Sequence, residues 1–406
     1  MYDAIIVGAR CAGATTALLL ARRGHRVLLL ERSRPDTDTI STHYIHRTGT
    51  ARLARLGLLG ALQDSGCPAL GHSCHSIEGV VIRKDVSASP GNPVAYGPRR
   101  YILDSLLCQA AVDAGAEFRH CTVTELTWSD GRVTGVRART RNGGSFSAKG
   151  RVVVGADGMN STVADLLRAE KYHEQPRATC VYYTYWSGMS AVSGIHIRNR
   201  RGIAVVPTHD DTVCVAAIWP VNEFTRIRRD IVGNYLRAVR ETTPEIFEGI
   251  QNSHRAHRFV GTASTANFYR ASAGPGWALV GDAGFHKDSL PANGISDALE
   301  HAELLADHIH QGLAGAADLD TVLTRYARSR DAGTFDSYRL TCWLAGMRIP
   351  ASVVRRLQVL ASSERGSAHF FSLLAQALTE SRESPARNRS ESSPSTPASP
   401  RAASPR

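Results

Sequence analysis

The chain has 406 residues, 43% of them hydrophobic and 21% charged, which is the length and composition of a soluble globular protein with one large or two moderate domains. The formal net charge of +11 would suit an anionic cofactor, but no basic run alternates with stacking aromatic side chains, so we predict no nucleic-acid partner. No uninterrupted apolar stretch of about 18 residues occurs and the N-terminus lacks a basic region, so we predict no integral membrane contact and a cytoplasmic protein. The cysteines and histidines form no C-x-x-C or H-E-x-x-H pattern, and we therefore expect no metal site.

The first 32 residues predict one βαβ unit. "AIIVG" and "HRVLLLE" have the apolar character of buried parallel strands, and "AGATTALLLARRG" between them has a helical spacing of small and apolar residues. Gly8 and Gly13 occupy the first and third glycine positions of a G-x-G-x-x-G dinucleotide fingerprint, where they permit a tight turn and close helix packing. Arg10 replaces the second glycine, and its guanidinium could pair with a phosphate or turn outward. Glu31 stands where an acidic residue holds the ribose hydroxyls and disfavours NADP.

Further along the chain, the sequence predicts more of this α/β framework with an antiparallel sheet inserted into it. Residues 178–220 are rich in β-branched and aromatic residues with turn signals between short runs, which is typical of antiparallel strands. Helices are predicted over 47–64, 101–113, 222–240 and 294–313, and buried strands ending in glycine over 151–158 and 276–284. From about Ser381 the chain consists almost wholly of Ser, Pro, Arg, Ala and Glu, so we expect a disordered tail at 381–406.

Two motifs of aspartate and glycine follow predicted strands. Asp157 and Gly158 end the strand "RVVVGADG", and Gly281 and Asp282 end the strand "WALVGD". An aspartate at a strand end is well placed to accept hydrogen bonds from the hydroxyls of a ribityl chain. Gly294 opens a long predicted helix, whose first N–H groups could bind a flavin carbonyl that gains negative charge on reduction.

In this order, the fingerprint, the acidic residue and the two aspartate motifs resemble the FAD-dependent oxidoreductases of the p-hydroxybenzoate hydroxylase fold over residues 1–315. That superfamily includes aromatic monooxygenases, geranylgeranyl reductases and flavin-dependent halogenases. The resemblance implies an α/β fold, with a Rossmann-like FAD-binding domain of the GR2/PHBH type, an inserted antiparallel β-sheet substrate domain and C-terminal helices. It divides the chain into FAD-binding parts at 1–75, 101–170 and 271–315, substrate-domain segments at 76–100 and 171–270, C-terminal helices at 316–380 and the tail at 381–406.

The family pattern also implies which residues bind FAD. Arg10 is usual in the fingerprint of similar bacterial oxidoreductases, so we expect FAD with its adenosine end at Glu31 and the adjacent Arg32. Arg47 and Arg100 match arginines that lie near the flavin or its phosphates. The other implied cofactor residues are Gly8 and Gly13 at the pyrophosphate, Asp157, Gly281 with Asp282 at the ribityl chain, and Asn293, Gly294 and Ile295 at the pyrimidine side of the ring.

The chain departs from the family pattern at three places. The hydroxylase motif runs D-G-x-x-S-x-x-R, and Ala164 stands at the position of its arginine. This replacement weakens the expectation that NADPH binds there, unless Arg168 takes the place of the missing arginine. Phe285 stands where the family often has a histidine. The W-x-W-x-I-P signature of the halogenases is absent, because the comparable region reads "YYTYWSGM". A halogenase is therefore the least favoured of the alternatives.

Candidates for catalysis and substrate binding come from two loops and one strand. The candidates for catalysis are the polar residues expected beside the flavin or the substrate, namely His43, His46, His286 and Lys287. Alternatively, the last two are solvated surface residues and the first two only position their loop. Tyr183, Tyr185 and Trp186 could form the wall of an aromatic substrate pocket or belong to the sheet core.

The resemblance implies an FAD-dependent enzyme of secondary metabolism. The first hypothesis is a monooxygenase that hydroxylates or oxidises an aromatic or polyketide-like small molecule with NAD(P)H and O2. The second is a reductase or dehydrogenase of the geranylgeranyl reductase type, which needs no oxygen. The third is a flavin-binding sensor or interaction module that uses the tail as its contact. Motif order leaves open the substrate, the choice between NADH and NADPH, and the oligomeric state.

Overall fold

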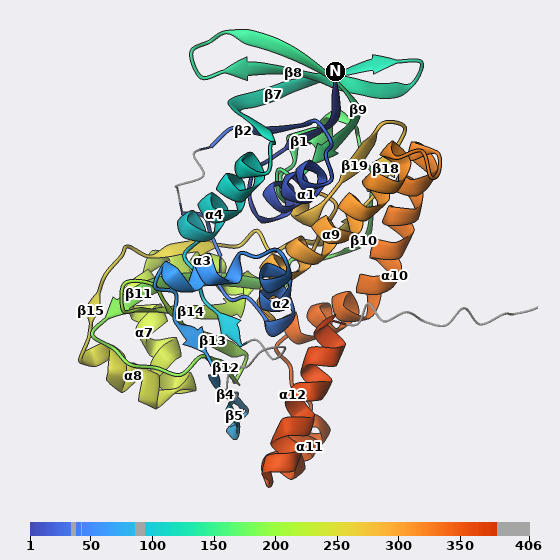
Figure 1. Ribbon diagram of the computed structural model, residues 1–406. Coiled ribbons are helices and arrows are strands. Elements are labelled where there is room, and N and C mark those ends of the chain that lie inside the picture. Colours follow the sequence, from blue (N-terminus) through green and yellow to red (C-terminus); the bar gives the residue numbers. More distant parts are fainter. Residues whose placement is uncertain (34–37, 42, 86–93, 380–406) are drawn as a thin grey trace, which may run out of the picture.

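The computed structural model describes residues 1–33, 38–41, 43–85 and 94–379, and the predicted disordered tail lies outside these residues (Figure 1). Its first unit is a parallel sheet in the order β7-β2-β1-β9-β19, with β18 antiparallel to β19 at the edge. The strands are β1 (Tyr2–Val7), β2 (Val27–Glu31), β7 (Glu117–Ser129), β9 (Ser145–Gly155), β18 (Ala273–Gly274) and β19 (Trp277–Leu279). The two apolar runs of the predicted βαβ unit pair in parallel as β1 and β2, as expected for strands buried on both faces.

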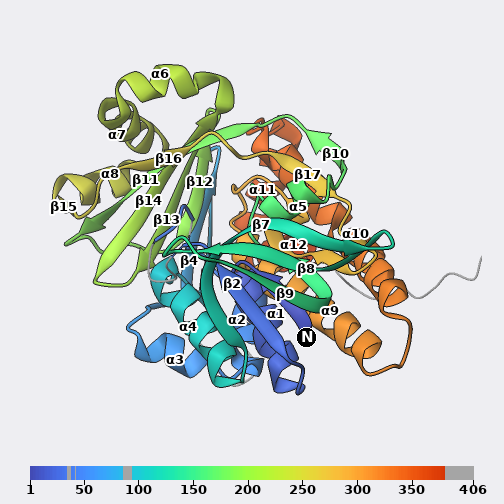
Figure 2. The ribbon, with the colours of Figure 1, turned by 90° about the horizontal axis from the view of Figure 1, so that it is seen from above.

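Helices cover one face of this parallel sheet, and a three-stranded meander covers the other (Figures 1 and 2). The helices are α1 (Cys11–Arg22), α4 (Arg100–Asp113), α9 (Gly294–Leu313) and α10 (Leu319–Ala345). The meander consists of β8 (Arg132–Thr140) between the extended ends of β7 and β9. Alternate residues of β1 face the two layers, because Ala4 and Ile6 pack with the helices while Ile5 packs with Val133 and Val136 of β8.

The second unit is a larger, mainly antiparallel sheet in the order β15-β11-β14-β13-β12-β4-β5, with β16 also paired to β11. The strands are β4 (His72–Ile77), β5 (Val80–Asp85), β11 (Thr179–Ser187), β12 (Gly194–Arg198), β13 (Arg201–Thr208), β14 (Thr212–Pro220), β15 (His254–Arg255) and β16 (Val260–Thr262). Strand β4 joins β12 in parallel, with Ser76 opposite His196. Two segments more than 100 residues apart in the sequence therefore form one sheet.

Three helices cover the outer face of the large sheet, and they differ from the single helix predicted over 222–240 (Figure 2). They are α6 (Phe224–Arg229), which follows the short 3-10 turn η1 (Val221–Glu223), α7 (Ile231–Thr242) and α8 (Pro244–Gln251). The break falls at Asp230, whose carboxylate accepts a hydrogen bond of 2.8 Å from the amide of Gly233 and caps α7. The helix predicted over 47–64 is likewise two helices, α2 (Arg47–Arg55) and α3 (Leu59–Asp64), separated at Gly57 with a φ of +72°.

The C-terminal helices α10, α11 (Ala351–Ala361) and α12 (Glu364–Thr379) run from the parallel sheet to the far edge of the large sheet (Figure 1). There Leu357 of α11 packs against Val80 and Ile82 of β5. The smaller elements are β3 (Ala69–Leu70) with β6 (Ala95–Tyr96), the sheet of β10 (Lys171–Gln175), β17 (Asn267–Arg270) and β20 (Phe285–His286), the helix α5 (Thr162–Leu166) and the 3-10 turn η2 (Gly281–Ala283). This arrangement confirms the predicted fold class of an α/β framework with an inserted antiparallel sheet and C-terminal helices.

Across the part of the chain that the structure describes, no helix combines the length and apolar character needed to cross a membrane. Over the same residues, no group of three His, Cys, Asp or Glu side chains is placed to hold a metal ion.

Candidate functional site

The fingerprint turn between β1 and α1 depends on both of its glycines. Gly8 has a φ of +104°, and a Cβ there would collide with the carbonyl of Ala156 and lie 2.9 Å from the amide nitrogen of Asp157. A Cβ at Gly13 would collide with the carbonyl oxygen of Gly8. The turn therefore brings the first turn of α1 against the loop that follows β9, as the roles of the first and third fingerprint glycines require.

Arg10 leaves the start of α1 open rather than blocking it. It is the N-cap residue, in an extended conformation, and no side chain caps the first amide groups of the helix. Its guanidinium points toward α4 and lies 3.9 Å from the buried carboxylate of Asp104, which Arg100 also binds through two hydrogen bonds of 3.0 Å. Because two guanidinium groups share one carboxylate beside uncapped N–H groups, this end of α1 is suited to an anionic phosphate.

Glu31 at the end of β2 stabilises the fingerprint turn between β1 and α1. One carboxylate oxygen accepts a 2.7 Å hydrogen bond from the amide of Ala9, and the other accepts hydrogen bonds of 2.8 and 2.7 Å from the amide and hydroxyl of Ser33. The Glu31 side chain is buried, whereas the adjacent Arg32 is exposed. The oxygen bound by Ala9 can still accept a further hydrogen bond, so contact of Glu31 with a ribose stays a prediction.

The first aspartate motif forms a loop that supports the fingerprint turn. Asp157 accepts hydrogen bonds from the hydroxyl of Ser161 at 2.5 Å and the amide of Val163 at 3.2 Å, so it holds the start of α5. Burial raises the pKa of its carboxyl group. Arg270 of β17 is influenced by this loop: burial lowers the pKa of Arg270, and the carboxylates of Asp165 and Asp157 oppose that shift. By contrast, Arg168 is exposed.

The second aspartate motif lies beside the uncapped start of α9. Gly281 has a φ of +61° and packs against α1, because a Cβ there would lie 2.8 Å from the Cβ of Ala12. Asp282 is exposed and lines a small cavity together with Gly294. The side chain of the N-cap residue Asn293 does not cap α9, and a Cβ added to Gly294 would meet no atom within 4 Å. The first turn of α9, which includes the buried Ile295, therefore starts beside this small cavity with N–H groups that have no acceptor within the helix.

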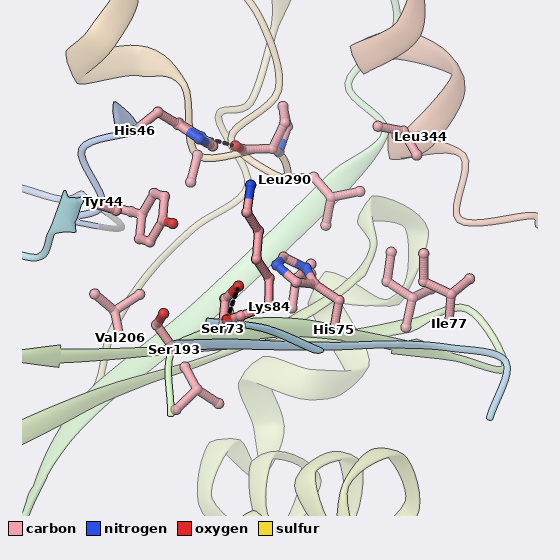
Figure 3. Close-up of a pocket in the computed structure, with 18 of the residues that line it drawn as sticks. Tyr44, His46, Ser73, His75, Ile77, Lys84, Ser193, Val206, Leu290 and Leu344 are labelled. Carbon is pink, nitrogen blue, oxygen red and sulfur yellow. Dashed lines mark hydrogen bonds between the residues drawn. The ribbon is translucent and has the colours of Figure 1, made fainter. Parts of the chain in front are cut away.

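A larger pocket of about 320 Å³ lies on the other side of the loop that leads into α9 (Figure 3). Its floor is the large sheet, and its other walls are the start of α2, residues 289–292 and the helices α10 to α12. His46 binds this loop through a 2.9 Å hydrogen bond from Nε2 to the carbonyl of Pro291, and its amide donates to Ser296 of α9 at 3.1 Å. The polar side chains that reach the pocket include His46, Arg47, Ser73, His75, Lys84 and Ser193.

The family model of the FAD binding domain matches residues 1–333. The chain belongs to this FAD-binding family. The predicted cofactor is therefore confirmed, and the residues fit it: a glycine turn that admits no Cβ, uncapped starts of α1 and α9, and an exposed Asp282 between them. FAD would lie from the glycine turn to Gly294.

Relatives of this FAD-binding protein include enzymes of several kinds. It is 26% identical over 330 residues to 6-methylpretetramide 4-monooxygenase of Streptomyces rimosus, covering 77% of this chain and 76% of that protein. It is 30% identical over 164 residues to digeranylgeranylglycerophospholipid reductase of Methanocella arvoryzae, covering 40% of each chain. The chain aligns with about 40% of the length of the first relatives that it matches at 30% identity or more. The flavin-dependent brominase Bmp2 shares the fold, with a TM-score of 0.77 at 17% identity over 92% of this chain and 98% of that one.

His286 and Lys287 of the FAD-binding protein are held by neighbouring elements. Nδ1 of His286 is hydrogen-bonded to the carbonyl of Ala266, and its ring stacks on Phe268 with centroids 5.9 Å apart. Lys287 is buried and forms a 3.0 Å ion pair with Asp297 in the first turn of α9. These contacts hold His286 against β17 and Lys287 against α9, and a catalytic role for either residue stays a prediction.

The predicted aromatic residues of β11 divide between the two faces of the large sheet. Tyr183 and Tyr185 face the flavin-binding unit, where the hydroxyl of Tyr185 is hydrogen-bonded to Nε2 of His43 at 2.5 Å. His43 is fully buried, and burial lowers its pKa to about 3, so it is neutral at pH 7. Trp186 faces the opposite side, where its indole N–H donates to the hydroxyl of Tyr235 at 3.0 Å in the core under α7. The lining of the large pocket described above comes from other residues.

Sequence reasoning missed the pocket residues of β4 and β5. Ser73 and Lys84 are paired across these strands, as are His75 and Ile82. The available signal was only that every second residue of "HSCHSI", namely Ser73, His75 and Ile77, shares one face of a strand. That signal could not identify which face meets a pocket.

Proposed function

We propose that this FAD-dependent protein is a monooxygenase that hydroxylates or oxidises an aromatic or polyketide-like small molecule with NAD(P)H and O2. One observation carries the proposal, namely the position of the large pocket. Pro291 and Ala292 line that pocket and are followed directly by Asn293 and Gly294, which begin α9. A small molecule in the pocket would thus be separated from the flavin end of FAD by one short loop. When bound, FAD supplies the redox chemistry, accepting electrons from NAD(P)H and passing them to O2.

The residues around the pocket would bind the substrate, orient it and exclude water. The walls are largely apolar, so they would desolvate an aromatic body. Burial lowers the pKa of His46 to about 4, and its Nε2 must carry the hydrogen because the carbonyl of Pro291 can only accept one. Nδ1 of His46 is therefore an unprotonated acceptor. It suits a hydrogen bond from a substrate hydroxyl and is a weak base for removing that proton.

The monooxygenase relative supports this choice because it aligns over about three quarters of both chains. A reductase and a brominase are also similar to the chain, so the test has to separate three reactions. The purified protein with FAD would be mixed with NADH or NADPH and a panel of phenols and polyketides, with and without O2. The flavin absorbance and the product masses would be recorded.

We expect NAD(P)H to bleach the flavin without air and O2 to restore it, with a product that has gained one oxygen atom. Turnover that proceeds equally well without O2 would favour the reductase and contradict the proposal. A product that forms only when bromide or chloride is added would favour the halogenase. Bound flavin that no donor reduces under any substrate would favour a sensor.

A further inference from the structure

The large pocket has a net positive lining. Arg47 at the start of α2 and Lys84 of β5 both reach it, and none of the described residues that line it is Asp or Glu. The nearest carboxylate in sequence, Asp85, points away and lies 2.7 Å from Nδ1 of the exposed His72. Figure 3 shows Lys84 extending from the sheet into the pocket, toward the loop that carries Leu290 and the ring of His46.

The histidines of the pocket do not add to this charge. Burial lowers the pKa of His46 to about 4 and that of His75 to about 3, so both rings are neutral at pH 7. Burial also lowers the pKa of Lys84, and the charge of Arg47 lowers it further. Burial and the charge of Arg47 both disfavour the charged form of Lys84, and an anion bound beside Lys84 would favour that form.

Apolar surface extends away from these cations. In Figure 3, Ile77 and Leu344 lie on one side of Lys84 and His75, and Tyr44 and Val206 lie on the other. Residues from α10 and α11 continue the apolar wall beyond Leu344. The volume of about 320 Å³ is near the lower limit for small-molecule sites, so it suits a compact ligand of a few rings better than a long lipid chain.

We propose that this pocket binds a compact organic anion, with its acid group held by Arg47 and Lys84 and its apolar body against the sheet and the C-terminal helices. The proposal rests on the proposed function, since it names the substrate class of the same site. It predicts that an acid binds better than a neutral molecule of the same shape, because only the acid can form charge-assisted hydrogen bonds with the two cations.

The test uses the full chain loaded with FAD and measures binding by titration calorimetry. The probes are 2-naphthoate, its neutral isostere 2-naphthamide, and 2-naphthyl phosphate. We expect at least one of the two acids to bind roughly tenfold tighter than the amide. The acid that binds more tightly identifies the anionic group as a carboxylate or a phosphate. Lys84→Met should weaken the binding of that acid about tenfold and change the binding of the amide by less than about twofold. Lys149→Met is the matched control, because Lys149 is exposed on the meander far from the pocket lining, and it should change neither affinity.

Three results would overturn the proposal. The amide could bind as well as both acids, the affinity of the acid could be the same in Lys84→Met, or the folded variant could lose its FAD, which would assign Lys84 to the cofactor. If Lys84→Met does not fold, the comparison of acid and amide in the unaltered protein and in Lys84→Gln decides the question. The binding test measures no turnover, so its failure would contradict the anion proposal and leave the monooxygenase proposal untouched. Oxygen-independent turnover would contradict the monooxygenase proposal and leave the anion proposal untouched.

Discussion

Single residues of this protein are constrained mainly where the backbone approaches the cofactor. Gly8 combines a φ of +104° with a site where any Cβ meets the backbone of Ala156. Arg10, at the position of the second fingerprint glycine, is tolerated because its side chain turns toward Asp104 while its backbone stays open. The fingerprint therefore requires a particular backbone shape rather than three glycines.

Gly8→Ala should weaken both folding and cofactor binding. A positive φ and a collision with fixed backbone cost about 1–3 kcal/mol, so we expect a loss of that size in the free energy of unfolding and FAD binding at least about tenfold weaker. Urea unfolding and a flavin fluorescence titration would measure the two effects. Gly60→Ala is the control, because Gly60 is exposed in α3 with open space around it and should lose nothing. Unchanged FAD affinity in Gly8→Ala would contradict this account of the turn.

At the scale of elements, the helix α10 fixes the loop that carries the second aspartate motif. Arg330 of α10 is almost completely buried, and its guanidinium donates to the carbonyls of Gly284 at 2.8 Å and Arg270 at 3.3 Å. It also donates to the carboxylate of Asp331 at 2.9 Å. One side chain thus connects α10 with β17 and with the turn η2, whose Asp282 is the expected ribityl contact.

Arg330→Met should remove the hydrogen bonds that connect α10 with β17 and the turn η2. Removing the cation leaves buried carbonyl groups without their donor, so we expect the free energy of unfolding to fall by about 3 kcal/mol and FAD to bind more weakly. Arg328→Met changes an exposed arginine on the same helix and should stay within about 0.5 kcal/mol of the original protein. Denaturant unfolding of the two variants side by side measures the difference, and equal stability would refute the role given to Arg330.

At the scale of the whole molecule, the C-terminal helices close the pocket between the two units. They begin beside the parallel sheet and end against β5, so the substrate pocket has walls from both units and from the C-terminal helices. The residues predicted to bind FAD, in contrast, all lie no later than the first turn of α9. Because α10 also supports the loop of Asp282, the separation applies to α11 and α12: substitutions there should open the pocket without changing cofactor binding.

Leu357→Asp tests this separation. Leu357 is 6% exposed against Val80 and Ile82, so a carboxylate there should displace α11 from β5. We expect faster amide hydrogen exchange in α11 and α12, with FAD affinity unchanged within about twofold. Val359→Asp, at a side chain that is 72% exposed on the same helix, should leave the exchange as it was. Loss of FAD from Leu357→Asp would mean that cofactor binding depends on the packing of α11 against β5.

The sequence by itself determined the structural features that depend on residues close together in the chain. The turn at Gly8, the strands β1 and β2 and the extent of α9 follow from local backbone preferences and from hydrophobic periodicity, and they allowed the cofactor to be predicted. Even locally, the prediction over 222–240 was wrong in one respect, because the capping of α7 by Asp230 outweighed the continuous helical pattern.

Only the tertiary structure decided which side chains from distant segments meet. The pairing of β4 with β12 places Lys84 and His75 in the pocket, and the position of β17 brings Arg270 under the influence of Asp165 and Asp157. Trp186 alternates with Tyr185 along β11, and both are buried, yet only the packing of α7 on one face of the sheet determines which of them meets that helix. Such contacts join residues far apart in the chain, and their energies depend on how whole elements pack, which no local pattern encodes.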